Sequence, residues 1–387
     1  MAPPTPVGRG RLAGDSGGSG GAGVPQRTLL VFDHFLKYCT GLASGLIAEG
    51  SHVVMLGRTR DSEFGGSPGS ALGFVDRELH GRVPFERLPG RVRDPRSPAA
   101  VLAARRELDR FSPRVVHLQE SVVNDLRLLA AARVRPGRYA LTVHDPTPHP
   151  GDAVRARWKR RLRSSLIRHA GVVFVHGERL GAELKAVERP LGAVVAVPHG
   201  IERPEVAALP ERPSLLFFGR LSHYKGLDTL LDAMPAVWNR SAGTTLTVAG
   251  AGTLPDHPLL TDGRVTLRHE HIPEEAVAEL FAGATCVVLP YRQASQSGVG
   301  SWAKRHGRPI VATAVGGLPE LVSPGTGRLV PPEDPEALAD ALVEVLTTPG
   351  LAARLAAGAA RSAVEDASWE HVASVTLDAY RRCLTKI

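Results

Sequence analysis

The sequence predicts an α/β protein built from two doubly wound domains, and three observations carry that prediction. At 387 residues the chain is longer than the size at which a single hydrophobic core stops growing. Short apolar runs alternate with segments of helical periodicity, which is typical of parallel sheets. A proline-rich stretch at 200–213 interrupts this alternation, and the same alternation then starts again.

The first half of the chain supplies one complete set of alternating strands and helices. Apolar runs predict the strands, and apolar residues three and four positions apart predict the helices. The strands are expected at 28–32, 52–56, 115–118, 139–143, 171–175 and 193–197, and the helices at 38–49, 99–109, 122–132, 154–169 and 178–187. We expect residues 27–205 to form the first domain.

The second half repeats the pattern, and we expect residues 206–370 to form the second domain. Its strands are expected at 215–218, 245–249, 265–268, 286–289 and 309–313, and its helices at 227–238, 273–282, 297–306 and from 335 onward. Ligands bind beyond the carboxyl ends of the strands in open parallel sheets. Two such sheets facing each other therefore predict a deep cleft between the domains.

Composition and charge narrow the class of protein. Hydrophobic residues make up 43% and charged residues 22%, which is typical of a globular chain. The formal net charge of +8 suits a phosphorylated ligand, a nucleic acid or a membrane surface. Because the sequence contains no zinc finger, no RNA-binding aromatic motif and no long basic arm, we expect no nucleic-acid partner.

The cysteines and the N-terminal segment indicate in which cellular compartment the protein is expected. Cys39, Cys286 and Cys383 are odd in number and widely spaced, which favours neither a disulfide framework nor a zinc site. Residues 1–26 are rich in Gly, Ser and Pro and predict a disordered tail rather than a signal peptide. We expect a soluble cytoplasmic protein. The basic segment 158–163 is a solvated helix face or a site of weak peripheral membrane contact.

The loop at 217–226 is the most informative local feature. An apolar strand leads into it and a helix follows it, and it carries Arg220 and Lys225 between Gly219 and Gly226. Glycines permit close backbone approach, a helix start offers free N–H groups, and an arginine can donate two bonds to phosphate oxygens. The loop therefore suits a diphosphate. The alternative is a solvated loop with two ordinary surface cations.

Five motifs in the second half, in this order, resemble the donor domain of the family 4 retaining glycosyltransferases. The Gln-Ser-Gly-Val motif is typical of one branch of that family, and shorter motifs in the first half resemble its acceptor domain. The five are Gly-Arg-Leu-Ser-His-Tyr-Lys-Gly-Leu-Asp (219–228), Val-Ala-Gly-Ala-Gly (248–252), Val-Leu-Pro-Tyr (288–291), Gln-Ser-Gly-Val (296–299) and Gly-Arg-Pro-Ile-Val-Ala-Thr-Ala-Val-Gly-Gly-Leu-Pro-Glu-Leu-Val (307–322).

This resemblance implies the GT-B fold, in which a C-terminal helix, here within 371–387, packs back on the first domain. It also implies a nucleotide-diphosphate sugar in the cleft, most simply a UDP-hexose, and transfer with retention at the anomeric carbon. Arg220 and Lys225 would then neutralise the charge that builds on the diphosphate as the glycosidic bond breaks. We expect no cofactor beyond the donor and no metal, since the one acidic triplet, at 61–63, lies far from the donor motifs.

The same resemblance assigns a phosphate cradle to Gly219 together with Gln296, Ser297, Gly298 and Val299. Taken alone, Ser297 is a plausible helix N-cap, and the resemblance favours phosphate contact instead. The Gly-Gly-Leu-Pro-Glu segment is expected to form a turn and a helix start. There the carboxylate of Glu320 would support the dipole of its own helix, with no catalytic role.

One departure from the family pattern limits the prediction of the donor sugar. Most relatives carry two glutamates eight residues apart, and those positions fall on Ala294 and Trp302 here. Sugar hydroxyls would then be recognised by Gln293, Ser295 or Gln296, and ribose recognition has no assigned residue. A catalytically silent protein that binds sugar nucleotides therefore stays among the alternatives.

Polar side chains also follow strands of the first half. His144 comes directly after a strand; alone it is more typical of a capped turn, and the resemblance places it in the sugar or acceptor pocket, with His149 a weaker candidate. His117 and Glu120 are further acceptor-pocket candidates. Lys37 stands where relatives have glycines, and it is either a phosphate contact or a surface cation.

We therefore expect a soluble glycosyltransferase that moves a hexose from UDP-glucose or UDP-N-acetylglucosamine to a small hydroxylated acceptor. The composition and the resemblance suggest 2-deoxystreptamine in aminoglycoside antibiotic biosynthesis, with a cell-envelope or exopolysaccharide acceptor as the alternative. A sugar-nucleotide epimerase shares the two-domain build, but the basic loop at 219–226 speaks against it.

Overall fold

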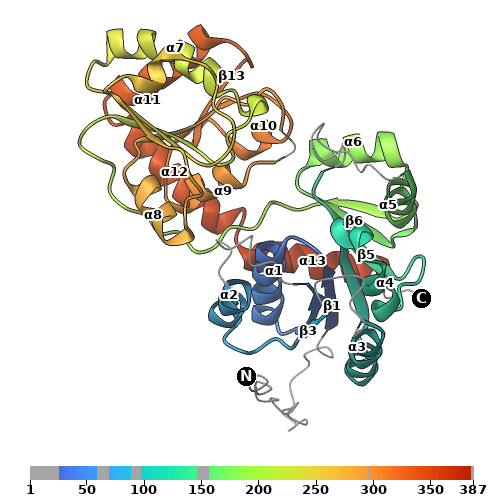
Figure 1. Ribbon diagram of the computed structural model, residues 1–387. Helices are drawn as coiled ribbons and strands as arrows, with labels where there is room; N and C mark the ends of the chain where they lie inside the picture. Colours follow the sequence, from blue (N-terminus) through green and yellow to red (C-terminus); the bar gives the residue numbers. More distant parts are fainter. Residues whose placement is uncertain (1–25, 59–68, 89–96, 146–156, 295, 385–387) are drawn as a thin grey trace.

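The structure is a computed structural model that describes residues 26–58, 69–88, 97–145, 157–294 and 296–384. Figure 1 shows two α/β domains, the first in blue to green and the second in yellow to orange. The two Rossmann-like domains, predicted from the alternation of strands and helices, are confirmed. None of the described helices combines the length and the apolar character needed to cross a membrane.

The first domain is built on a seven-stranded parallel sheet in the order β3-β2-β1-β4-β5-β6-β7. Its central strands are mostly apolar, as expected of a parallel sheet that helices cover on both faces. The strands are β1 (Arg27–Phe32), β2 (His52–Gly57), β3 (Phe85–Arg87), β4 (Val115–Gln119), β5 (Tyr139–Val143), β6 (Val172–Val175) and β7 (Ala193–Ala196). The helices are α1 (Leu36–Ala48), α2 (Ser70–Leu79), α3 (Ser97–Phe111), η2 (Glu120–Asn124), α4 (Leu126–Ala132), α5 (Arg157–His169) and α6 (Glu178–Glu188).

The second domain has a six-stranded parallel sheet in the order β10-β9-β8-β11-β12-β13. Its strands are β8 (Ser214–Phe218), β9 (Thr245–Ala249), β10 (Val265–Arg268), β11 (Cys286–Leu289), β12 (Ile310–Thr313) and β13 (Gly327–Val330). Its helices are η3 (His223–Lys225), α7 (Leu227–Arg240), η4 (Pro258–Thr261), α8 (Glu274–Ala282), α9 (Gly298–Arg305), α10 (Leu318–Leu321), α11 (Pro335–Thr347) and α12 (Leu351–Glu365).

The two strand orders define where ligands are expected. In each sheet the order reverses between two adjacent strands, β1 and β4 in the first and β8 and β11 in the second. Ligands of open α/β sheets bind outside the carboxyl ends of the strands at such a switch point. The loops that follow β8 and β11 carry Gly219 to Lys225 and Tyr291 to Val299, so the basic loop and the Gln-Ser-Gly-Val loop meet at the switch point of the second sheet.

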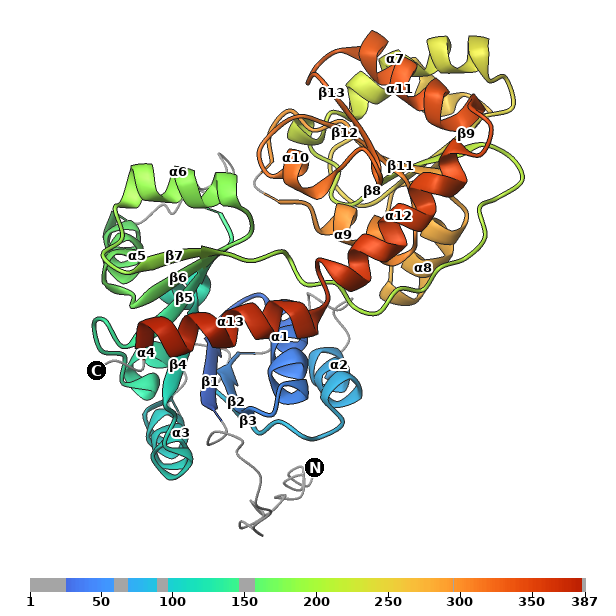
Figure 2. The ribbon, with the colours of Figure 1, turned by 180° about the vertical axis from the view of Figure 1, so that it is seen from behind.

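The C-terminal helix crosses back to the first domain, as the resemblance implied. Figure 2 shows α12 on the second domain leading into α13 (Trp369–Leu384), which lies across the first. The Trp369 ring fits against Gly41 of α1, where an added Cβ would lie 2.0 Å from a ring carbon. Tyr380 of the same helix is fully buried in the first-domain core. The chain therefore passes between the domains twice.

Several local predictions were wrong in detail. The helix expected at 122–132 is divided, because Asp125 leaves helical geometry and caps α4 by accepting a hydrogen bond from the Arg127 amide at 3.1 Å. The elements α2, β3 and β13 were not predicted. Both missed strands lie at sheet edges, where they are short and only partly apolar, so the apolar-run signal is weak.

Candidate functional site

The basic loop after β8 is held by its neighbours in a defined shape. Gly219 and Gly226 have φ values of 109° and 67°, and a Cβ on Gly226 would lie 1.9 Å from the Pro290 carbonyl oxygen. Arg292 ties this turn to the loop after β11: its amide donates to the Tyr224 carbonyl at 2.8 Å and its guanidinium pairs with Asp228 at 2.8 Å. The two loops therefore form one unit at the switch point.

Lys225 is a buried cation in this unit. The residue is 8% exposed. Its Nζ donates to the Tyr291 hydroxyl at 2.7 Å and lies 4.1 Å from the centre of the Tyr291 ring. Burial, together with the positive charge of nearby Arg220, lowers the pKa of Lys225 to about 8, although Tyr224 opposes the shift. Within the described part of the chain no carboxylate forms an ion pair with Lys225. A buried charge of this kind favours an anionic ligand.

Arg220 and the Gln-Ser-Gly-Val loop surround Lys225. Arg220 is exposed at the end of β8, close enough to Lys225 to affect its charge. A Cβ on Gly219 would lie 3.2 Å from Val299 and 3.9 Å from the Lys225 Nζ, so these three residues are neighbours. Of the predicted cradle residues, Gly219 and Val299 thus lie beside the buried ammonium group of Lys225.

Ser297 has the helix-capping role that the sequence offered, and its hydroxyl also lies next to Tyr291. Its side chain caps α9 by accepting a hydrogen bond from the Gly300 amide at 3.3 Å, and its Oγ lies 3.3 Å from the Tyr291 hydroxyl. Polar contacts therefore run from the Lys225 ammonium through the Tyr291 hydroxyl to the Ser297 hydroxyl. Gln296 points elsewhere: its Nε2 donates to the His176 carbonyl of the first domain. Gly298 is exposed at the first position of α9.

The two positions where relatives carry glutamates are occupied by apolar packing. Trp302 stacks on His306 with ring centres 5.5 Å apart and contacts Phe281 of α8 at 6.1 Å. Ala294 is half-buried, and its carbonyl oxygen would lie 1.4 Å from a Cβ on Gly316. Gln293 is exposed, and Ser295 lies outside the described residues.

His144 lies in a buried cluster of rings at the end of β5. Its Nε2–H donates to Gln119 Oε1 at 2.8 Å, and its Nδ1 accepts from His176 Nε2 at 3.0 Å. Phe35 stacks on its ring at 3.8 Å. Burial, with a smaller contribution from the neighbouring histidines, holds the pKa of His144 well below its usual range. The ring is therefore a neutral, oriented imidazole within a cluster of rings in the first domain.

Glu120 binds the two residues that follow β5. Its Oε1 accepts from the amides of His144 and Asp145 at 2.9 and 3.1 Å, and its Oε2 pairs with Arg163 at 3.0 Å. Burial raises the pKa of Glu120, although Arg163 opposes that shift. Its carboxylate is therefore engaged within the protein.

The other first-domain candidates lie away from the donor loops. His117 is buried between the Tyr380 hydroxyl at 2.6 Å and Thr142 Oγ1 at 2.7 Å, so it ties β4 to β5 and α13. The Lys37 ammonium lies over the Phe74 ring of α2 at 5.8 Å. His149 and the acidic triplet at 61–63 lie outside the described residues. In the described part no three His, Cys, Asp or Glu side chains are grouped to hold a metal.

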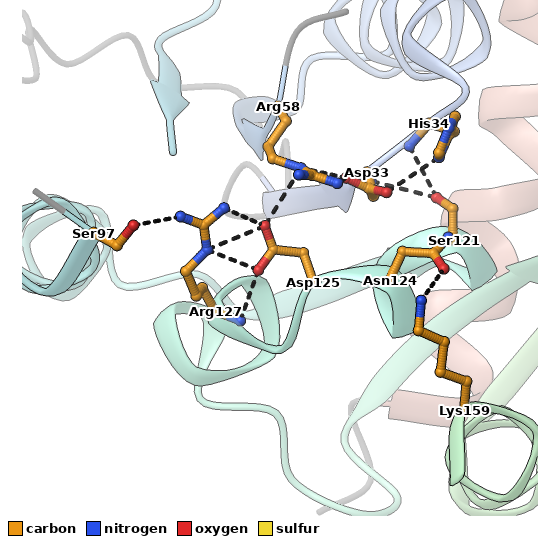
Figure 3. A network of polar contacts seen from close by, with 9 residues as sticks. All are labelled: Asp33, His34, Arg58, Ser97, Ser121, Asn124, Asp125, Arg127 and Lys159. Atoms are coloured by element: carbon orange, nitrogen blue, oxygen red, sulfur yellow. Dashed lines mark hydrogen bonds and ion pairs between the residues drawn. The ribbon is translucent and has the colours of Figure 1, made fainter. Parts of the chain in front are cut away.

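Sequence reasoning missed an ion network at the switch point of the first sheet, which Figure 3 shows from close by. Asp33 follows β1, is fully buried and pairs with Arg58, whose Nε also lies 3.3 Å from Asp125. Arg127 pairs with the same Asp125 at 2.6 Å. His34 is at the edge, with its Nδ1 3.1 Å from Asp33. The available signal was an acidic residue directly after an apolar strand.

Both halves of the chain match glycosyltransferase family models. Residues 37–203 match the model described as Glycosyltransferase Family 4, and residues 212–348 match the model described as Glycosyl transferases group 1. The two matches abut at the linker between the domains, and each corresponds to one of the two sheets.

Curated relatives and solved structures agree with these matches. A glycogen synthase from Mycobacterium tuberculosis is 29% identical over 289 residues, which are 70% of this chain and 69% of that protein. A D-inositol 3-phosphate glycosyltransferase from Nocardioides sp. is 37% identical over 201 residues, 46% of this chain and 44% of the relative.

The solved structures show the same fold. Sucrose-phosphate synthase from Thermosynechococcus elongatus superposes with a TM-score of 0.68 at 23% identity, covering 92% of this chain and 98% of the other. HepE from Anabaena in complex with UDP superposes with a TM-score of 0.68 at 15% identity, covering 92% and 100%.

Proposed function

We propose that this GT-B glycosyltransferase, whose two halves match the Family 4 and group 1 models, transfers a hexose from a nucleotide-diphosphate sugar to a hydroxyl group of a small acceptor. The observation that carries the proposal is the buried ammonium of Lys225, which lacks a carboxylate partner in the described residues and lies beside Arg220. A donor diphosphate would supply the missing negative charge.

The donor is proposed to be a UDP-hexose, UDP-glucose or UDP-N-acetylglucosamine. HepE, a neighbour of the same fold, was solved with UDP and with UDP-glucose, which supports UDP as the first nucleotide to test. The diphosphate would lie between Lys225, Arg220 and the start of α9, where helix amides are free to donate.

The reaction is proposed to proceed with retention and without a protein nucleophile. The acceptor oxygen bonds to the anomeric carbon, the bond from that carbon to the diphosphate breaks, and the acceptor proton passes to the departing phosphate oxygen. Lys225 and Arg220 stabilise the negative charge that grows on the diphosphate. His144, whose two ring nitrogens are bonded to Gln119 and His176, would influence the position of the sugar or the acceptor through these partners, from the facing domain.

The acceptor is proposed to be a small polyhydroxylated ring, with 2-deoxystreptamine as the first candidate. The engagement of Glu120 by two amides and Arg163 removes one carboxylate that a cationic acceptor would use. The panel therefore needs neutral and anionic acceptors beside it.

The test is mass spectrometry of the products formed from a donor and acceptor panel. The donors are UDP-glucose and UDP-N-acetylglucosamine, and the acceptors are 2-deoxystreptamine, inositol 3-phosphate and a lipid-linked polysaccharide precursor. Transfer to a small acceptor supports the proposal, and transfer only to the lipid-linked acceptor supports the envelope alternative. Epimerised donor, or bound donor with no product in any mixture, contradicts it.

A further inference from the structure

Two side chains of the second domain bind one short segment of the first, residues 176–179. Glu320 of α10 accepts hydrogen bonds from the backbone amides of Glu178 and Arg179, each at 2.7 Å. Gln296 donates to the His176 carbonyl in the same segment. Figure 2 shows α6 and α10 facing each other across the space between the domains. These contacts are called the interdomain clasp here.

The clasp supplies a helix cap that the first domain lacks. The N-cap position of α6 is Gly177, which has no side chain to accept a bond from the first amides of the helix. Glu320 occupies the place of a capping carboxylate, although it lies in the other domain and 142 residues away in sequence from Glu178. Glu320 stands in the first turn of its own short helix α10, as expected, and its carboxylate in addition supports the dipole of α6.

Gly177 is required for this contact on two grounds. Its φ of 125° is a conformation that side chains rarely adopt, and a Cβ there would lie 2.4 Å from Glu320 Oε2. The carboxylate thus fits into space that only glycine leaves open, so the two residues form a matched pair across the cleft.

The clasp fastens the donor loops to the strand end that carries the histidine cluster. His176 donates through its Nε2 to His144, and its carbonyl accepts from Gln296, which directly precedes Ser297. A shift of one domain relative to the other would therefore move the phosphate loops relative to His144. Reactions between two bound groups are sensitive to displacements of about 1 Å.

We propose that Glu320 is a positioning residue that closes the cleft by capping α6 of the facing domain, with Gly177 as its required partner. This inference rests on the proposed function for its catalytic consequence only. The contact itself is a property of the protein without substrate.

Hydrogen exchange of the full chain tests the contact directly. In Glu320→Ala we expect the amides of Glu178 and Arg179 to exchange at least tenfold faster, followed by mass spectrometry on peptides that begin in β6. Glu279→Ala removes an exposed carboxylate on α8 of the same domain and is expected to leave this exchange unchanged. Unchanged protection in Glu320→Ala, or equal loss in Glu279→Ala, would overturn the proposal.

Kinetics test the positioning role. Glu320→Ala is expected to lower kcat about tenfold while UDP binding, which uses the second domain, changes by less than twofold. Gly177→Ala is expected to lower kcat in the natural background and to have a smaller effect on top of Glu320→Ala, since the clash is then gone. Wild-type kcat together with lost amide protection would overturn the positioning role. If no sugar transfer is detected with any donor, the proposed function fails, and the exchange experiment still decides whether the clasp exists.

Discussion

The two switch points of the molecule carry charge in opposite ways. In the second domain Lys225 is buried with a tyrosine hydroxyl as its partner and with a second cation nearby. In the first domain the buried Asp33 and Asp125 are each paired with an arginine. Under the proposed function an anion completes the first arrangement, whereas the second is complete as it stands. The comparison therefore assigns Lys225 to a proposed ligand site and the paired network to a structural one.

The paired network should show its largest effect in stability. Arg58→Ala removes the cation shared by Asp33 and Asp125, and the loss of one partner from a buried ion pair costs about 3–5 kcal/mol. Chemical denaturation checks this against Arg110→Ala, which breaks an exposed pair with Glu107 and should cost less than about 1 kcal/mol. Equal losses in the two variants would show that the first-domain network is not a structural site.

The unpaired cation should show its largest effect in turnover. Lys225→Ala is expected to lower kcat by about a hundredfold or more with a smaller change in donor binding, because the ammonium stabilises charge that develops in the transition state. A steady-state transfer assay measures this, with Lys185→Ala on the exposed surface of α6 as the control. Native turnover in Lys225→Ala would remove Lys225 from the catalytic machinery.

The low pKa of Lys225 predicts a pH effect with a definite sign. Since burial lowers this pKa to about 8, the Lys225 ammonium of the free enzyme loses its proton as the pH rises above 8. We therefore expect kcat/KM for the donor to fall to about one tenth at pH 9. UDP should restore the charge, so its binding at pH 9 takes up close to one proton. Titration calorimetry in buffers of different ionisation enthalpy measures that uptake, and a buffer-independent heat would contradict it.

The same shift makes stability depend on pH in the same direction as a paired carboxylate does, because the folded pKa is lowered in both cases. Between the folded pKa of about 8 and the ordinary value of 10.5, the unfolded chain binds the Lys225 proton and the folded chain does not. The contribution of Lys225 to stability therefore rises with pH across that window. Bound UDP should cancel this dependence.

The smallest expected effect is that of Ser297→Ala, which distinguishes helix capping by Ser297 from contact with the donor phosphate. Ser297→Ala removes a helix cap and should cost about 1 kcal/mol of stability, as should Asp334→Ala, which removes the cap of α11. Phosphate contact by Ser297 predicts a further loss in kcat of about tenfold that Asp334→Ala does not share. Equal kinetics in the two variants would leave Ser297 as a cap alone.

Local patterns in the sequence predicted most of the fold and indicated the two loops that the structure brings together after β8 and β11. The central strands are apolar on both faces, so β1, β5, β8 and β12 are evident as continuous runs. The donor residues lie in two contiguous loops, each directly after a strand. A short stretch of sequence therefore contained the information needed to place them together.

The acceptor side and the clasp could not be predicted for a physical reason. Glu120 was visible as a carboxylate after β4, but its partners come from the turn after β5 and from Arg163 of α5. Glu320 looked like a residue in the first turn of its own helix, and its actual partner is a helix of the other domain. Contacts of this kind depend on how distant segments are placed, and periodicity and spacing do not report that.

The most direct test of the central claim is a crystal structure of the protein with UDP bound. We predict that the diphosphate oxygens lie within hydrogen-bonding distance of the Lys225 ammonium and the Arg220 guanidinium, next to the start of α9. A diphosphate bound elsewhere, with Lys225 still bonded only to Tyr291, would contradict the claim that the unpaired cation marks the donor site.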